Sequence, residues 1–213
     1  MNAGLSNLAG LKAHLLPATM QNSGTYDQVI LDLGLGLASM FEGFCNRKFS
    51  RMSGDTYTVN AQRMALVLPR YPIESIDALA IFSDANTSWE TLVVNDNIVS
   101  WEADTGLVNF GSQLGEATAK VRVTFTGGYW WQTDEPGEVQ QAQPSGSTVL
   151  PDALKTAWIL QCRQAWSVID RLGLTIGIAK GGPAAGVANQ VLSELDMVPQ
   201  VKSALERFRR FSF

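Results

Sequence analysis

The spacing of apolar residues changes twice along the 213 residues, and this change limits the possible folds more than any other feature. In residues 26–49 apolar side chains recur every three or four positions, which is the period of one helix face. After Phe49 the period falls to two, in short runs rich in β-branched and aromatic residues. The helical period returns in residues 151–172. The pattern predicts an α+β fold, in which a small bundle with two long antiparallel helices and short terminal helices carries an inserted antiparallel β-module.

Local signals place the ends of the expected helices. A short helix over 7–16 should end at Pro17, because proline lacks the amide that continues a helix. Thr25 and Gln28 have the spacing of a capping box at the start of the first long helix. Proline suits the first helical turn, so Pro151 is expected to open the second long helix and Pro199 a short terminal one.

Glycines interrupt the first long helix at positions 34, 36 and 43. Each costs about 1 kcal/mol relative to alanine in a helix interior. Their presence indicates that a neighbouring backbone packs closely against this helix.

Seven runs carry the strand pattern between the long helices. They are "TYTVN", "RMALVLP", "IESIDALAIF", "ETLVVN", "NIVSWE", "GLVNF" and "AKVRVTFTG". In the last run Val121, Val123 and Phe125 alternate with Arg122, Thr124 and Thr126. About six strands with one polar face indicate a small antiparallel sheet or barrel.

The expected domain organisation follows from these boundaries. Residues 1–50 and 150–213 should form the helical bundle with a C-terminal tail, and 51–131 the β-module. Residues 132–149, rich in Gln, Pro, Gly and Ser, should form an extended linker or arm with little capacity to bury surface. Residues 173–190, which include "AKGGPAAG", are expected to be mobile.

Composition excludes several classes of protein. A net charge of −4 argues against a general nucleic-acid binder, which needs an excess of Lys and Arg. Cys45 and Cys162 lie in apolar segments and should be buried thiols, as suits a reducing cytoplasm. The N-terminal residues lack the pattern of a signal peptide, and no run of about 18 apolar residues predicts a membrane span. The expected protein is soluble, with no membrane partner.

Motifs for catalysis or metal binding are missing from the sequence. The single histidine, His14, has no metal-binding companion at ligand spacing, and CxxC, HExxH and DxDxDG patterns do not occur. "GLGLAS" at 34–39 lies within a helical stripe, so it lacks the strand-to-helix turn of a phosphate-binding loop. "AKGGPAAG" at 179–186 lacks the ending of a P-loop. The sequence predicts neither an enzyme nor a cofactor.

Two clusters differ from an ordinary globular domain. The tail gathers basic and aromatic residues, namely Arg207, Phe208, Arg209, Arg210, Phe211 and Phe213. Such residues are enriched in interface cores, so the tail either covers its own bundle or docks into another protein. Tyr129, Trp130 and Trp131 follow the last strand directly. These rings either close the base of the β-module or contact a partner.

The order of several segments resembles a known family. A short "LKAHL" helix, a long helix ending "FEGFCNRKF", then "LVLPRYPIESIDAL", "VRVTFTGGY" and "LPDALKTAWILQCRQAW" follow one another before an Arg-rich terminus. This order resembles the head–tail connector proteins (adaptors or head-completion proteins) of long-tailed double-stranded DNA bacteriophages and related gene-transfer particles. The resemblance covers about residues 7–172 and 198–210.

The resemblance implies a structural role in the virion neck after assembly in the host cytoplasm. Copies of the chain would form a ring, twelvefold to match the portal, and a stopper or tail-completion protein would bind next. Double-stranded DNA would pass through without sequence-specific binding. The tail residues Arg207–Phe213 would reach the portal protein, and Tyr129–Trp131 would contact another subunit or a neck protein. The β-module and the 132–149 linker depart from the shortest relatives, which leaves open which surface meets the portal.

Three other functions are compatible with the sequence. An enzyme would need acidic residues that are distant in the sequence to converge in a pocket. A stopper or tail-terminator protein would occupy the same region of a virion, but those proteins are mostly β and lack long flanking helices. A carbohydrate- or ligand-binding β-module would need Trp130 and Trp131 as an exposed platform.

Overall fold

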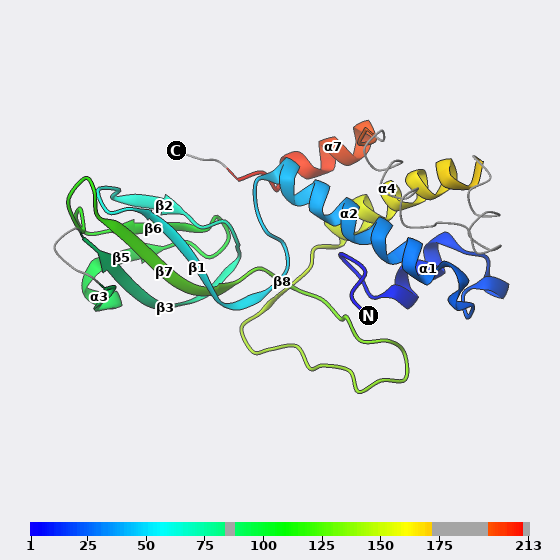
Figure 1. Cartoon of the computed structure of the whole chain (residues 1–213), viewed down its shortest axis with the longest axis horizontal. Coiled ribbons are helices and arrows are strands. Elements are labelled where there is room, and N and C mark those ends of the chain that lie inside the picture. The colour runs from blue at the N-terminus through cyan, green and yellow to red at the C-terminus, as the bar shows by residue number, and fades with distance from the viewer. Residues whose placement is uncertain (84–87, 172–195, 211–213) are drawn as a thin grey trace. The chain divides into compact units, whose positions relative to one another are not determined.

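The computed structural model describes residues 1–83, 88–171 and 196–210, which form two compact units (Figure 1). The helical unit comprises residues 1–45, 131–143 and 150–209, and the β unit comprises 46–130, 144–149 and the segment that begins at Arg210. Helices and antiparallel sheets together confirm the predicted α+β class. The loop predicted over 173–190 lies outside the described residues.

Among the described residues, the helical unit contains four α-helices. They are α1 (Leu8–Leu15), α2 (Asp27–Cys45), α4 (Asp152–Arg171) and α7 (Pro199–Glu206). Two short 3-10 helices, η1 (Ala18–Met20) and η2 (Gly24–Tyr26), connect α1 to α2. Each of α1, α4 and α7 packs against α2. Both predicted long helices and both predicted short helices are therefore confirmed.

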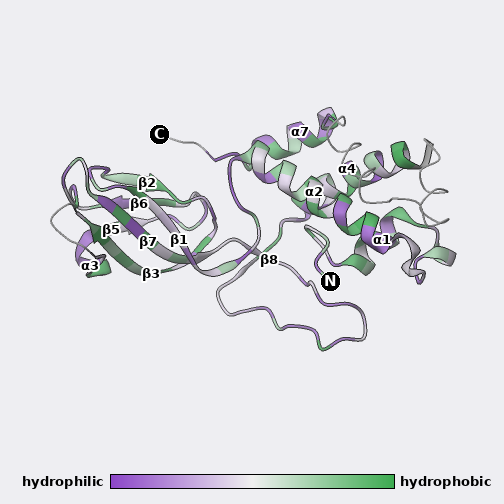
Figure 2. Ribbon diagram, in the orientation of Figure 1, coloured by the Kyte–Doolittle hydropathy of each residue, from purple (hydrophilic) through white to green (hydrophobic). Residues whose placement is uncertain are grey.

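Apolar stripes on α2 and α4 meet in the core of the helical unit. The buried residues of α2 are Val29, Ile30, Leu33, Gly34, Leu37, Phe41 and Cys45, and those of α4 include Leu154, Trp158, Cys162 and Ile169. Along the ribbons of Figure 2, apolar positions alternate with polar ones. Both cysteines are buried free thiols, as predicted. Burial raises the pKa of the Cys162 thiol.

One segment, Gly24–Cys45, is long and apolar enough by length and composition to cross a membrane. This differs from the expectation that no segment would reach that length. The buried stripe of α2 packs against the other helices of its own unit, so α2 serves here as a core helix.

The predicted capping box at Thr25 and Gln28 is wrong. The chain enters α2 through the 3-10 turn η2, where the Ser23 hydroxyl accepts a hydrogen bond from the Thr25 amide. The Gln28 side chain donates forward to Asp32 at 2.9 Å. Asp27 instead opens the helix and binds the ammonium group of Lys12 on α1 at 2.5 Å. A carboxylate in the first turn is favourable because it faces the positive end of the helix dipole.

The prediction that a neighbouring backbone packs closely against α2 is confirmed at Gly34 and is wrong at Gly43. A Cβ atom built on Gly34 would lie 2.1 Å from the carbonyl oxygen of Ala3. At Gly43 such an atom would meet nothing within 4 Å. The N-terminal segment therefore approaches the α2 backbone at one of these glycines and leaves the other open.

Two antiparallel sheets form the β unit. One has the strand order β1 (Met52–Asn60), β7 (Lys120–Gly127), β3 (Ile73–Phe82) and β4 (Glu90–Leu92). The other has the order β2 (Ala65–Val67), β6 (Leu107–Phe110) and β5 (Ile98–Trp101). A short parallel pair joins β8 (Tyr129–Trp130) to β9 (Thr148–Val149). Each predicted run contains a strand, but "ETLVVN" continues into the short helix α3 (Val94–Asn97).

Side chains from both sheets share one core in the β unit. Val121, Val123 and Phe125 of β7 are buried, as the alternation predicts. They pack with Leu66 of β2 and Val108 of β6 in the same cluster. Two sheets with a common interior make a small sandwich, which replaces the single sheet or barrel that the strand pattern suggested.

Candidate functional site

The predicted tail residues are divided between the two units. In the helical unit, Arg209 binds Glu206 at 3.2 Å and lies 5.4 Å from the centroid of the Phe44 ring. Arg207 is exposed and lies 5.0 Å from the ring of the half-buried Phe208. Phe211 and Phe213 lie outside the described residues.

Arg210 belongs to the β unit and is held there by two strands. Its guanidinium group donates to the Tyr57 hydroxyl on β1 at 3.1 Å and to the carbonyl oxygen of Val67 on β2. Within the described chain, its buried Nε–H has no hydrogen-bond partner. A buried donor without an acceptor is costly, so this position favours an additional group that accepts a hydrogen bond.

The short helix α7 fastens the start of the tail to the helical unit. Val201 and Leu205 are fully buried against α4 and α2. The Cys45 thiol donates to the carbonyl oxygen of Leu205 at 3.7 Å. Residues 199–206 therefore cover the bundle, and the basic and aromatic residues of the tail begin immediately after this covered segment.

The aromatic triplet is likewise divided. Tyr129 is buried in the β unit, where the Arg47 guanidinium carbon lies 5.3 Å from its ring centroid. Trp130 is half-buried in β8. Trp131 is half-buried in the helical unit, and its indole N–H has no partner among the described residues. Neither tryptophan is the exposed platform that a carbohydrate-binding module needs.

Arg47, which the sequence reading did not single out, organises the aromatic end of the β unit. Its guanidinium carbon lies 3.3 Å from the Tyr71 ring centroid and 5.3 Å from that of Phe49. The group also donates to the carbonyl oxygen of Tyr71. Burial lowers the pKa of Arg47 and raises that of Tyr71. The only sequence signal was an arginine between aromatic and apolar neighbours in "FCNRKF".

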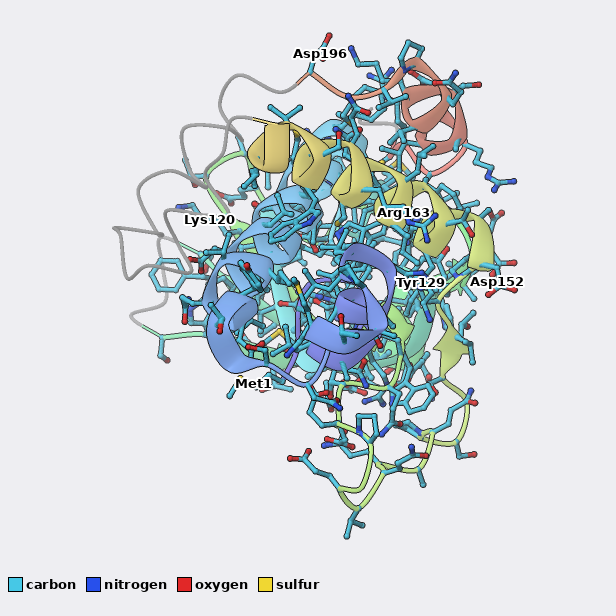
Figure 3. The ribbon with its side chains drawn as sticks, turned by 90° about the vertical axis from the view of Figure 1, so that its right-hand side faces the viewer. Met1, Lys120, Tyr129, Asp152, Arg163 and Asp196 are labelled. Carbon is cyan, nitrogen blue, oxygen red and sulfur yellow. The ribbon has the colours of Figure 1, made fainter. Side chains whose placement is uncertain are left out.

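His14, the single histidine, is exposed on α1. Partial burial, together with Arg163 and Lys155, lowers the pKa of its imidazole. Arg163, which projects from α4 in Figure 3, donates to the His14 carbonyl oxygen at 3.2 Å. Across the part of the chain that the structure describes, no group of three or more His, Cys, Asp or Glu residues is placed to hold a metal ion.

The segment predicted as a linker contains a helix cap. The Glu135 carboxylate accepts hydrogen bonds from the amides of Leu8 and Ala9 at 3.1 and 3.0 Å, at the start of α1. The Asn7 side chain donates to the carbonyl oxygen of Asp134 at 2.6 Å. These bonds join residues more than 120 positions apart, so spacing along the sequence does not predict them.

We expect Glu135→Gln to lower the free energy of unfolding of the helical unit by about 1 kcal/mol. The substitution removes the negative charge that faces the amides of Leu8 and Ala9 at a helix start and that pairs with the Met1 ammonium group at 2.7 Å. Helical circular dichroism during urea denaturation measures the change. Glu138→Gln in the same segment is the matched control, since Glu138 is exposed and its carboxylate accepts from the Glu135 amide and not from an amide of α1. Equal destabilisation by both substitutions would contradict the capping role.

Comparison with known proteins finds similarity in solved structures. No family model matches this chain, and no curated protein matches it. A chain from the neck of an empty gene transfer agent (GTA) particle, computed with C6 symmetry, has a TM-score of 0.55 and 16% identity; the match covers 97% of this chain and 90% of that chain. At this identity, the similarity shows that the two chains share a fold.

Two further structures share this fold. A chain of the virion of the native GTA particle has a TM-score of 0.55 and 14% identity, with 97% and 90% coverage. A chain of the native GTA neck computed with C12 symmetry has a TM-score of 0.51 and 15% identity, with 97% and 89% coverage. Since 97% of this chain is matched, the shared fold includes both the helical unit and the β unit.

Proposed function

We propose that this protein is a structural subunit of the neck of a phage-like particle, where it forms a ring that connects the portal vertex to the tail. The fold similarity to neck chains over nearly the full length of both proteins carries the proposal. The structures of those necks were computed with C6 and C12 symmetry. Such rotational symmetry supports a closed ring for this chain. A twelvefold ring would match a twelvefold portal.

Exposed apolar side chains support association with other subunits. Val99 and Trp101 lie two positions apart on β5, are 72% and 39% exposed, and occupy an edge of the three-stranded sheet. The register shifts between Ile98 and Ser100, so Val99 lies in a β-bulge of this edge strand. An edge strand with two exposed apolar side chains is suited to protein contact, because solvated apolar groups gain from burial.

The helical unit favours an adaptor over a stopper or tail terminator. In the described part of the chain, the two long helices α2 and α4 contain 19 and 20 residues and lie on either side of the strands in the sequence. Mostly β neck proteins would lack this unit. A net charge of −4 is also compatible with a channel wall along which DNA slides, because like charges limit adhesion.

The tail residues Arg207–Phe213 are our candidates for contact with the portal protein, and Tyr129–Trp131 for contact with a neighbouring subunit or neck protein. Arg207 is exposed directly after the covered helix α7. Arginine next to aromatic residues is common at energetically important positions of interfaces. Arg210 is already bound within the β unit, so its contribution to the portal contact would require an exchange of partners.

Truncation after Glu206 tests this assignment. We expect the truncated protein to lose attachment to its cognate portal, as seen by electron microscopy of the mixture, while its α-helical signal is retained because Val201 and Leu205 remain in the bundle. Full-length Val99→Ser is the control and should still attach if β5 contacts only neighbouring subunits. Retained attachment of the truncated protein would contradict the role of the tail. Absence of a ring with full-length protein and portal would contradict the proposed function itself.

A further inference from the structure

Strand β1 forms one edge of the four-stranded sheet. The Ala61 amide donates to the carbonyl oxygen of Ala119, the residue before β7. Tyr57 and Val59, which are four and two positions earlier, pair with Val123 and Val121 of β7 and should direct their backbone groups to β7 in the same way. In an antiparallel pair, alternate residues direct their backbone groups to opposite sides. The N–H and C=O groups of Thr58 therefore point away from β7, towards the open side of the sheet.

Strand β2 forms one edge of the three-stranded sheet. The amide of Leu68 donates to Gly106 next to β6, which places the even-numbered residues of β2 towards β6. Ala65 and Val67 accordingly turn their backbone groups outward. The bond from Arg210 to the Val67 carbonyl oxygen is consistent with this orientation.

A groove of about 790 Å³ separates these two edges. Its lining includes residues 57–60 of β1 and 65–67 of β2, with Leu107 and Asn109 of β6. Arg63 and Arg210 also line it, and none of the described lining residues is acidic. In a protein of net charge −4, this groove is thus locally basic. It lies between two terminal strands, of which β2 already uses its Val67 carbonyl oxygen to bind Arg210.

We propose that this groove receives the loop around Glu138 and Val139 from a second copy of the chain, which pairs there as an added strand. The inference rests on the proposed ring and names one of its contacts. Addition of an extended segment to an exposed sheet edge is a common mode of recognition, in which backbone bonds supply affinity and side-chain pockets supply selectivity.

The loop has the properties that the groove requires. Every residue from 136 to 143 is exposed, and none belongs to a helix or strand. Val139 is 94% exposed, the highest value among the large apolar residues that the structure describes. Residues 135–138 form a turn, closed by a bond from the Glu138 amide to the Glu135 carbonyl oxygen at 3.1 Å. The five residues 139–143 that follow would span roughly 16 Å in an extended strand, which is enough to pair with the three residues of β2.

Charge and polarity also match between the loop and the groove. The Glu138 carboxylate accepts one local bond, from the Glu135 amide at 3.2 Å, and so retains further acceptor capacity. Arg63 and Arg210 line the groove, and the Nε–H of Arg210 lacks an acceptor. Val139 would at the same time leave water for the half-buried side chains of Val67 and Leu107.

Cross-linking between two singly substituted proteins tests the contact. Val139→Cys and Ala65→Cys are mixed in equal amounts, assembled with the cognate portal and treated with a short bismaleimide. The natural thiols Cys45 and Cys162 are fully buried, so they should react slowly. We expect a covalent dimer of the two variants. Thr91→Cys replaces Ala65→Cys in the control, because Thr91 is exposed on β4, the opposite edge of the other sheet. That mixture should give no dimer.

Each other outcome counts against the proposed contact in a distinguishable way. If rings form but Val139→Cys cross-links to neither position, or equally to both, the inference is wrong and the proposed function stands. If a chain with both substitutions cross-links internally at a dilution that prevents assembly, the loop fills its own groove and the second copy is excluded. If no ring forms with the portal, the proposed function fails and the inference fails with it.

Charge reversal at Glu138 tests the electrostatic part separately. Glu138→Lys, added to Val139→Cys, would place a cation against Arg63 and Arg210, and we expect the yield of covalent dimer to fall roughly tenfold. An unchanged yield would overturn the assigned charge pairing. Ring formation by wild-type protein under the same conditions confirms that the assay itself reports assembly.

Discussion

Trp158→Ala is expected to lower the free energy of unfolding of the helical unit by about 3–5 kcal/mol. The Trp158 side chain is fully buried on α4, and its indole N–H donates to the carbonyl oxygen of Gly34 on α2 at 3.2 Å. Alanine would leave a large cavity between the two long helices and would remove the indole hydrogen bond to Gly34. Far-ultraviolet circular dichroism during urea denaturation measures the change, because it reports helix content without relying on the substituted indole.

Two variants separate the cavity from other effects of this substitution. Trp158→Phe keeps most of the ring volume and removes the donor, so we expect a smaller loss of about 1–2 kcal/mol. Trp101→Ala removes a tryptophan that is 39% exposed on β5, and it should leave the helical transition nearly unchanged. A Trp158→Ala protein as stable as the wild type would show that this ring is not part of the core.

Gly34→Ala and Gly43→Ala are expected to change stability in opposite directions although both lie in α2. At Gly34 the new methyl group would lie 2.1 Å from the carbonyl oxygen of Ala3 and 2.8 Å from Cδ2 of Leu11. The N-terminal segment must move to admit it, at a cost of about 1–3 kcal/mol. At Gly43 nothing lies within 4 Å, so the better helix propensity of alanine should raise stability by up to about 1 kcal/mol.

The comparison is informative because both substitutions add the same atoms to the same helix. Thermal denaturation of the two variants side by side, followed at 222 nm, gives the difference directly. The close contact at Gly34 would be refuted if both variants were stabilised. Loss of stability in both would instead indicate that Gly43 has a close neighbour.

The positions of helices and strands were largely predictable because their signals are local. The start of α7 at Pro199 and the alternation of β7 follow from the conformational limits of single residues and from the period of one element. Where a prediction from local sequence was wrong, neighbouring residues favoured another local structure. Ser23 and Asp27 took over the start of α2 from Thr25 and Gln28, and the strand in "ETLVVN" gave way to α3.

By itself, the sequence determined the α+β class, the order of elements, the buried stripes and the absence of recognisable catalytic motifs, since each depends on neighbours along the chain. The tertiary structure decided the contacts between distant segments. Glu135 caps a helix that begins at Leu8, Arg47 lies among three rings, and Arg210 connects β1 and β2 at a groove. No periodicity specifies which strand edges remain unpaired or which carbonyl oxygen approaches Gly34, because those depend on how complete elements pack together.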